Sequence, residues 1–225
     1  MRFDALLFDF DGVLIDSEAV GSAHLAAYLT GAGHPTTQEQ TIRFMGLSGE
    51  GFRAAVTHWI DGPLPDDFDT ALAGASARAL ADGIAEIAGA IAFVRSLPAD
   101  FPIAVVSSSS THWLSTHLTH LGLRERFGDH VYSGREHVRR GKPAPDLYLF
   151  GAERLGVDIA RVAIIEDSPV GATGAVASGG YVIGLCAGSH CPPDHGATLR
   201  ALGVHDIADD FEAVQRIVSA SPTAN

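Results

Sequence analysis

The stretch LLFDFDGVLIDSE, residues 6–18, predicts a buried strand that ends in two carboxylates. Its first residues continue an apolar run that begins at Ala5, as expected for a strand covered on both faces of a parallel sheet. Asp9 and Asp11 follow two residues apart, with Gly12 directly after them. Burying neighbouring carboxylates is costly unless a cation offsets their charge. The stretch therefore predicts a charged functional site at the end of a core strand.

Further apolar runs follow later in the chain, and helical patterns separate them. The runs lie at residues 102–106, 161–165 and 181–186. The expected helices lie at about 111–121, 145–155 and 169–178. This alternation is typical of an α/β fold, here a doubly wound and mainly parallel sheet.

Residues 17–83 interrupt the alternation, because only helical patterns occur there. Helices are expected at about 17–31, 36–44, 48–60 and 66–82. We interpret this segment as a small helical domain inserted after the first strand. The predicted organisation is an α/β core formed by residues 1–16 and 84–225, with an insertion at 17–83.

Composition restricts the partners and the compartment. The chain has 225 residues, of which 46% are hydrophobic, and its formal net charge is −12. Nothing resembles a basic stripe, which argues against nucleic acid as a partner. No apolar stretch approaches the length of a membrane span, and the acids in the first apolar run do not fit a signal peptide. With two cysteines in the chain, we expect a cytoplasmic protein.

Polar residues follow three of the predicted strands. In open parallel sheets, ligands bind beyond the carboxyl ends of the strands. The side chains expected at that edge are those of Asp9, Asp11, Ser107, Ser108, Glu166 and Asp167. The loop GKPAP, residues 141–145, can bring Lys142 to the same edge, and Lys142 is the only lysine beside fourteen arginines.

These residues allow chemistry on phosphorus. Ligand sets made of oxygen suit Mg²⁺, which accepts one or two carboxylates together with waters and a phosphate oxygen. Asp9, Asp167 and optionally Glu166 offer carboxylates, and Asp11 offers a backbone carbonyl. A carboxylate beside Mg²⁺ and a lysine can attack phosphorus and form an aspartyl phosphate. A second carboxyl group can protonate the leaving oxygen and then take a proton from water.

Four motifs of the chain resemble those of the haloacid dehalogenase superfamily and come in the same order. They read Asp9-Phe-Asp11-Gly12-Val13, Ser107, Gly141-Lys142-Pro143, and Glu166-Asp167-Ser168 with Gly171. The resemblance covers essentially the whole chain, and the helical insertion is similar to the small α-helical cap of this superfamily. The sugar-phosphate phosphatases and β-phosphoglucomutase are the members that it resembles most.

The resemblance implies a role for each motif residue. It implies Asp9 as the nucleophile, Asp11 as the acid and base, and Ser107 and Lys142 as phosphate-binding residues. It also implies Mg²⁺ between Asp9, Asp11 and Asp167, with Glu166 as a further ligand in some members. We add three residues as predicted substrate contacts: Gly12, Ser108 and, in the cap, Arg43. An ordinary solvated charge is the alternative for Arg43.

Departures from the superfamily pattern restrict the type of reaction that the chain is expected to catalyse. The dehalogenases lack the second aspartate of the first motif, so Asp11 favours phosphorus chemistry. β-Phosphoglucomutase carries a lysine and an arginine where this chain has Met45 and Gly49, so hydrolysis is favoured over a mutase reaction. The leading expectation is an Mg²⁺-dependent phosphatase for a small phosphorylated metabolite, either a sugar or a sugar-acid phosphate. The alternatives are a phosphomutase and, more remotely, a receiver-like signalling module.

Other polar and aromatic residues are expected to have structural roles. His112, His117 and His120 lie on one predicted helix, and we expect them at the surface. The loop SHCPPDHG, residues 189–196, is interpreted as a plain surface loop, with a zinc site formed by His190, Cys191, Asp194 and His195 as the alternative. Trp59 and Trp113 are expected to pack rather than bind.

Overall fold

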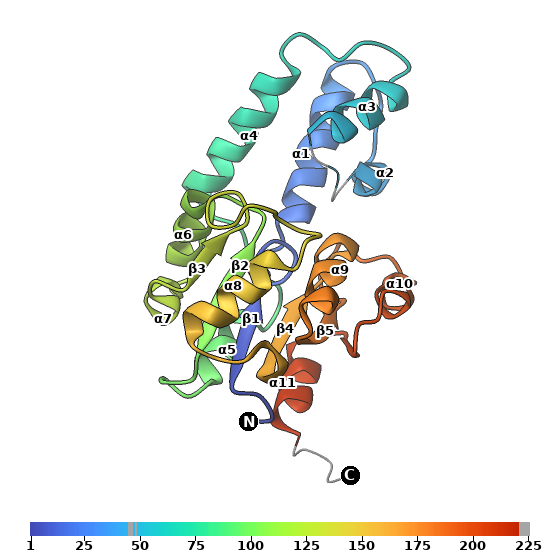
Figure 1. Ribbon diagram of the computed structural model, residues 1–225. Helices are drawn as coiled ribbons and strands as arrows, with labels where there is room; N and C mark the ends of the chain where they lie inside the picture. Colours follow the sequence, from blue (N-terminus) through green and yellow to red (C-terminus); the bar gives the residue numbers. More distant parts are fainter. Residues whose placement is uncertain (45–46, 48, 221–225) are drawn as a thin grey trace. The chain divides into compact units, whose positions relative to one another are not determined.

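A six-stranded parallel sheet forms the centre of the α/β part (Figure 1). The computed structural model describes residues 1–44, 47 and 49–220. The strand order is β3-β2-β1-β4-β5-β6. The strands are β1 (Ala5–Phe8), β2 (Ile103–Ser107), β3 (Val131–Ser133), β4 (Val162–Glu166), β5 (Tyr181–Leu185) and β6 (Asp206–Ala208). The predicted α/β doubly wound, parallel fold is confirmed.

Helices cover both faces of this sheet. They are α5 (Ala90–Ser96), α6 (Thr111–His120), α7 (Arg124–Phe127), α8 (Asp146–Leu155), α9 (Pro169–Ser178), α10 (His195–Ala201) and α11 (Phe211–Ser219), with a 3₁₀ turn η2 (Ile159–Arg161). Helices α8 and α9 pack on the face that carries Leu7 and Ile164. On the opposite face, the Phe8 ring lies 6.1 Å from Phe93 of α5 and 5.9 Å from Phe127 of α7. The sheet is therefore buried on both sides, as its continuous apolar strands predict.

The two edge strands were not predicted. The predicted runs at 102–106, 161–165 and 181–186 agree with β2, β4 and β5 to within one residue. Strands β3 and β6 have only three residues each, VYS and DIA. A strand this short shows neither a long apolar run nor a clear alternation, and its identity depends on its neighbour in the sheet.

The chain divides into two compact units, one formed by residues 1–16 and 85–225 and the other by residues 17–84. The second unit contains α1 (Ser17–Gly31), α2 (Gln38–Thr41), η1 (Ile42–Phe44), α3 (Gly49–Trp59) and α4 (Phe68–Asp82). Its core contains Leu25 and Leu29 of α1, Val56 of α3 and Phe68 of α4. The function of this unit as a cap stays a prediction.

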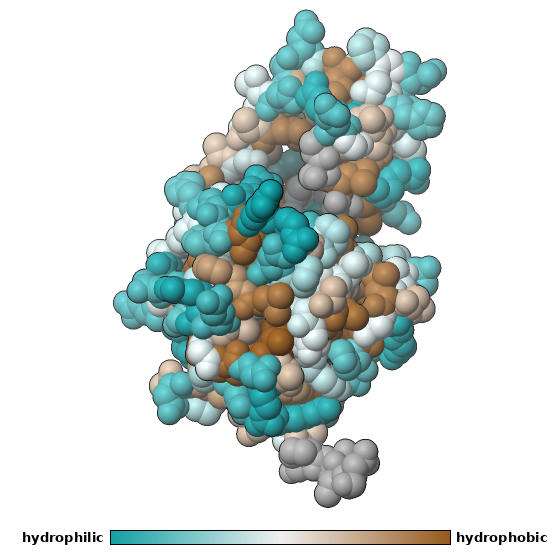
Figure 2. All heavy atoms as spheres, viewed as in Figure 1, coloured by the Kyte–Doolittle hydropathy of each residue, from teal (hydrophilic) through white to brown (hydrophobic). Residues whose placement is uncertain are grey.

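Hydrophilic residues surround smaller apolar areas on the face seen in Figure 2. Among the described residues, the large apolar side chains that are exposed are those of Met1, Leu47, Leu149, Val170 and Leu202. Single exposed side chains of this kind are normal for a protein surface. In the described part of the chain, no helix is long and apolar enough to cross a membrane.

Candidate active site

The ends of the three central strands meet at one edge of the sheet. Strand β1 pairs with β2 on one side and with β4 on the other, so that Phe8 lies between Val105 and Ile165. Asp9 directly follows β1, and its N–H donates to the carbonyl of Ile165 at 2.9 Å. Because all strands run in the same direction, the residues that follow β1, β2 and β4 come together there.

Lys142 forms ion pairs with two of the predicted site carboxylates. Its Nζ lies 2.8 Å from Asp9 Oδ1 and also contacts Glu166 Oε1. The Lys142 side chain is 4% exposed, so these charges interact in a poorly solvated environment. Burial alone lowers the pKa of Lys142, but the charges of Asp9 and Glu166 outweigh this effect and raise it. Lys142 is therefore held in its charged form.

Glu166 is fully buried and is bound from several sides. The Tyr148 hydroxyl donates to Glu166 Oε1 at 2.8 Å, next to the contact with Lys142. The N–H and Oγ of Ser168 each lie 3.2 Å from Glu166 Oε2. Ser168 also caps α9, since its Oγ accepts from the N–H of Gly171 at 3.0 Å. Glu166 thus has donors on both oxygens and holds Lys142 in place.

We expect Gly171→Ala to disturb this arrangement. An ideal Cβ at position 171 would lie 2.0 Å from Glu166 Oε1, so the carboxylate would have to move. We expect a loss of about 1–3 kcal/mol in the free energy of unfolding, measured by urea titration, together with lower activity. The matched control is Gly51→Ala in α3, where a Cβ meets nothing within 4 Å. Equal unfolding midpoints for the two variants would contradict the prediction.

Three acids form a candidate site for a divalent cation. Asp9, Glu166 and Asp167 can each offer an oxygen within 4.8 Å of the others, and all three are buried. Oδ1 of Asp167 is buried and has no hydrogen-bond partner among the described residues. Burial and the charge of Glu166 raise the pKa of Asp9 well above its usual range, even though Lys142 lowers it. The pKa of Asp167 is also raised by burial.

The donor chemistry of this cluster fits Mg²⁺. All the ligand atoms are carboxylate oxygens, and one of them is buried without a partner among the described residues. Burial, together with the charge of Glu166, raises the pKa of both Asp9 and Asp167. A hard divalent cation would offset the cost of keeping these acids ionised. Asp9 and Asp167 would hold the ion, whereas the contacts of Glu166 with Lys142, Tyr148 and Ser168 occupy both of its oxygens.

The Asp11 side chain does not join the acidic cluster. Its Oδ2 accepts from Ser109 Oγ at 2.6 Å, and its Oδ1 accepts from Trp113 Nε1 at 3.2 Å. A metal contact through the Asp11 backbone carbonyl stays a prediction. Trp113, which was expected only to pack, therefore binds a predicted catalytic residue.

The predicted phosphate-binding positions differ in exposure. Ser107 is buried at the end of β2, and its Oγ accepts from the N–H of Ser109 at 3.1 Å. Ser108 is exposed. Gly12 has a φ of 79°, and a Cβ there would lie 2.0 Å from Asp167 Oδ2, so only glycine permits this close approach. Their contacts with substrate stay predictions.

Arg43 lies in the helical unit. Its guanidinium is 4.7 Å from the centroid of the Trp59 ring, and Trp59 Nε1 donates to Thr36 Oγ1 at 3.1 Å. A substrate contact by Arg43 stays a prediction. Positions 45, 46 and 48 of the predicted cap segment lie outside the described residues.

The interpretation of residues 189–196 as a plain surface loop is wrong for its two histidines. His190 Nε2 lies 2.9 Å from Asp167 Oδ2, and His195 Nε2 contacts the carbonyl of Asp167. Burial lowers the pKa of His190, but the bond to Asp167 outweighs this effect and raises it to about 10. The loop follows β5, so it starts at the same edge of the sheet as the acids. Among the described residues, the zinc alternative gains no support, because the cation-site geometry is found only at Asp9, Glu166 and Asp167.

His117 also differs from the expected surface position. It is fully buried in α6, and neither ring nitrogen has a hydrogen-bond partner within the described ranges. Its ring lies 4.3 Å from that of Trp113. Burial lowers the pKa of His117, with a smaller opposing effect from Asp11.

The burial of His117 predicts a pH-dependent stability. Because its pKa is lower in the folded protein than in the unfolded chain, the unfolded chain binds the proton more readily. Stability is therefore lost as the pH falls through about 6.5, by up to about 1.4 kcal/mol per pH unit. We expect His117→Leu to reduce the difference between urea midpoints at pH 5.5 and pH 7.5. His112→Gln, at an exposed site of the same helix, is expected to leave that difference unchanged.

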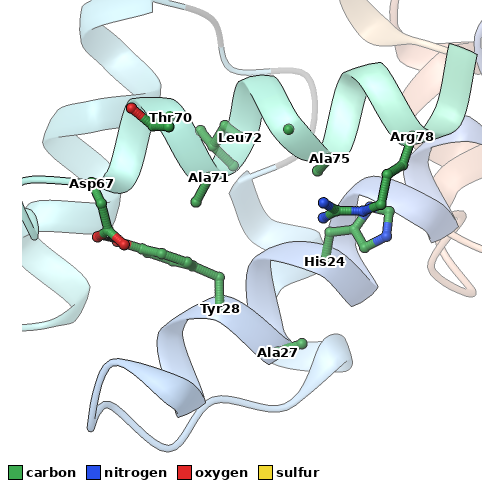
Figure 3. Close-up of a pocket in the computed structure, with 10 residues that line it drawn as sticks. His24, Ala27, Tyr28, Asp67, Thr70, Ala71, Leu72, Ala75 and Arg78 are labelled. Carbon is green, nitrogen blue, oxygen red and sulfur yellow. Dashed lines mark hydrogen bonds between the residues drawn. The ribbon is translucent and has the colours of Figure 1, made fainter.

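A separate pocket lies between α1 and α4 of the helical unit (Figure 3). It has a volume of 390 Å³, and its lining includes His24, Tyr28, Asp67 and Arg78. The Tyr28 hydroxyl donates to Asp67 Oδ1 at 2.6 Å. None of the predicted site residues lines this pocket, so we do not assign the chemistry to it.

Comparisons with known proteins agree with the motifs. The chain matches the haloacid dehalogenase-like hydrolase family over residues 3–179. It is 31% identical over 196 residues to hexitol phosphatase A of Escherichia coli K12. This alignment covers 85% of this chain and 87% of that protein. It is also 31% identical over 182 residues to fructose-1-phosphate phosphatase YqaB of the same organism, with coverages of 79% and 94%.

A solved structure shows the same architecture. A HAD family hydrolase from Deinococcus radiodurans R1, with bound phosphate and sodium, is similar with a TM-score of 0.87 and 33% identity. The similarity covers 97% of this chain and 96% of that chain. The chain belongs to the haloacid dehalogenase-like hydrolases, and the resemblance inferred from the motifs is confirmed.

Proposed function

We propose that this protein is an Mg²⁺-dependent phosphatase that hydrolyses a sugar or sugar-acid phosphate through an aspartyl-phosphate intermediate. The protein is a hydrolase of phosphoric monoesters. The metal, the intermediate and the substrate are the proposed parts. The observation that carries them is the buried cluster of Asp9, Glu166 and Asp167 with Lys142 paired to Asp9.

Asp9 is the proposed nucleophile. Lys142 contacts Oδ1 of its carboxylate and favours the ionised form, which is the form that attacks phosphorus. The attack forms a bond between Asp9 and phosphorus and breaks the bond from phosphorus to the leaving oxygen, which takes a proton from Asp11. Water then attacks the phosphorus and gives a proton to Asp11, and the bond between Asp9 and phosphorus breaks. This step releases phosphate and restores the Asp9 carboxylate.

The surrounding residues stabilise charge during both steps. Lys142 and the Ser107 hydroxyl are the proposed donors to the phosphoryl oxygens. When bound, Mg²⁺ supplies a Lewis acid that offsets the repulsion between Asp9 and the phosphate. Glu166 keeps Lys142 charged and in position through the contact described above.

The class of substrate is suggested by similar proteins. The names of two of them, hexitol phosphatase A and fructose-1-phosphate phosphatase YqaB, refer to phosphorylated sugars or sugar alcohols. The helical unit, with Arg43 as a candidate contact, is the proposed source of specificity for the leaving group. The two described cysteines are both free, which accords with the proposed location in the cytoplasm.

Phosphate release from a panel of phosphorylated sugars, sugar alcohols and sugar acids tests the proposal. We expect release with Mg²⁺ and none with excess EDTA, and Mg²⁺ should restore it. Release that is unchanged in EDTA would refute the metal requirement. Absence of release from the whole panel in Mg²⁺ would refute the substrate class.

Two alternative functions were considered, a phosphomutase and a receiver-like signalling module. A phosphomutase would convert β-glucose 1-phosphate in the presence of a bisphosphate primer without releasing phosphate. Met45, one of the two residues that favoured hydrolysis over this alternative, lies outside the described residues. The receiver-like alternative loses its support, because the chain belongs to a family of hydrolases.

A further inference from the structure

Both oxygens of the Asp11 carboxylate are bound, one by the loop between β2 and α6 and the other by the first turn of α6. Ser109 Oγ donates to Oδ2 at 2.6 Å, and Trp113 Nε1 donates to Oδ1 at 3.2 Å. Each donor contacts a different oxygen, so together they fix the rotation of the carboxylate about its own axis. The motifs assign no role to Ser109 or Trp113.

The two donors are themselves held in place. Ser110 caps α6, and its Oγ accepts from the N–H of Trp113 at 3.3 Å, which places Trp113 in the first turn of the helix. The Trp113 ring packs edge-on against the buried His117. The N–H of Ser109 donates to Ser107 Oγ at 3.1 Å, so Ser109 connects a predicted phosphate-binding residue with Asp11.

We propose that Ser109 and Trp113 are positioning residues, which orient the Asp11 carboxyl group so that it gives its proton to the leaving group and, once ionised, takes a proton from water. The inference rests on the proposed role of Asp11 in the reaction. An indole N–H can only donate, so Trp113 always presents the same group to Oδ1. Proton transfer depends on hydrogen-bond geometry, and a carboxylate that rotates freely would spend less time in the productive orientation.

Structural packing is the alternative role for Trp113. It predicts that Trp113→Phe, which keeps an aromatic ring and removes the N–H, leaves turnover unchanged. Orientation of Asp11 predicts a kcat that is about tenfold lower, with KM within twofold of the wild type, because the hydrogen bond that orients Asp11 is lost. Ser109→Ala is expected to have a similar effect, and Ser109→Thr, which keeps the hydroxyl, is expected to restore most of kcat.

An NMR measurement tests the contact between Trp113 and Asp11 independently of enzyme turnover. The chain has two tryptophans, so its ¹⁵N–¹H spectrum contains two indole signals, and Trp113→Phe identifies the signal of Trp113. Asp11→Ala is expected to shift the Trp113 signal and to leave that of Trp59 in place. Tyr181→Phe is the matched control for kcat, because it removes an aromatic side-chain donor that binds a carboxylate, Asp206, and neither residue belongs to the predicted site.

The outcomes separate this inference from the proposed function. If Asp11→Ala keeps full phosphatase activity, the role of Asp11 in the proposed function is wrong. If Asp11→Ala is inactive while Trp113→Phe and Ser109→Ala both keep the wild-type kcat, only the positioning role is overturned. A Trp113 signal that does not move in Asp11→Ala also overturns it. Should Trp113→Phe fail to fold, Ser109→Ala and its comparison with Ser109→Thr decide the same question.

Discussion

Asp9→Asn is expected to abolish phosphate release while making the metal-free protein more resistant to urea. The loss of activity should reach about four orders of magnitude or more, because an amide is a poor nucleophile and cannot replace the carboxylate in the attack on phosphorus. Catalytic groups are often held in the folded protein at a cost in stability, so an inactive but more stable variant is the result that a buried catalytic carboxylate predicts.

The gain in stability follows from the charge of the site. Burial and the neighbouring charge of Glu166 raise the pKa of Asp9, which shows that the ionised carboxylate is unfavourable in the folded protein without a metal. A group whose pKa is raised by folding costs stability once the pH exceeds its value in the unfolded chain, about 3.9. At neutral pH an asparagine removes that cost and keeps the shape of the side chain.

The measurement compares urea midpoints and phosphate release for the same preparations. Stability is measured in EDTA, and activity is measured in Mg²⁺ with a substrate from the panel. Asp4→Asn is the control, because Asp4 forms an exposed pair with Arg161 and is expected to change stability by less than about 1 kcal/mol. Activity of Asp9→Asn near the wild-type level would show that another residue is the nucleophile.

The sequence predicted the part of the site that depends on strand ends. Apolar runs located β1, β2 and β4, and the shared direction of parallel strands then placed Asp9 near Asp167. The same argument applied to β5 would have brought residues 186–191 to this edge and could have suggested that His190 meets Asp167. The sequence therefore contained a signal for this contact.

The side-chain environment within α6 was harder to predict, but the burial of one residue, His117, could be inferred from the sequence. Leu114, Leu118 and Leu121 repeat at the spacing of a buried helix face, and position 117 falls on that face. The burial of His117 therefore had a detectable signal. The contact of Trp113 with Asp11 had none, since it depends on side-chain rotamers and on the exact start of the helix.

The single lysine of the chain is expected to be required for stability as well as for activity. Lys142→Met should lower the free energy of unfolding by about 3–5 kcal/mol in EDTA, because it leaves Asp9 and Glu166 buried without their cation. Arg140→Met is a matched control only two positions away. Arg140 pairs with Asp146 at an exposed site, where the loss should stay below about 1 kcal/mol.

Two further variants separate charge from shape. Lys142→Arg keeps the positive charge, but a planar guanidinium differs in size and geometry from the ammonium that contacts both acids, so activity should fall while less stability is lost. Adding Glu166→Gln to Lys142→Met removes one of the two uncompensated charges and should recover part of the lost stability. If Lys142→Met unfolds at the same urea concentration as the wild type, the ion pairs with Asp9 and Glu166 do not hold the site together. If the double variant is no more stable than Lys142→Met, the loss comes from packing of the lysine side chain rather than from its charge.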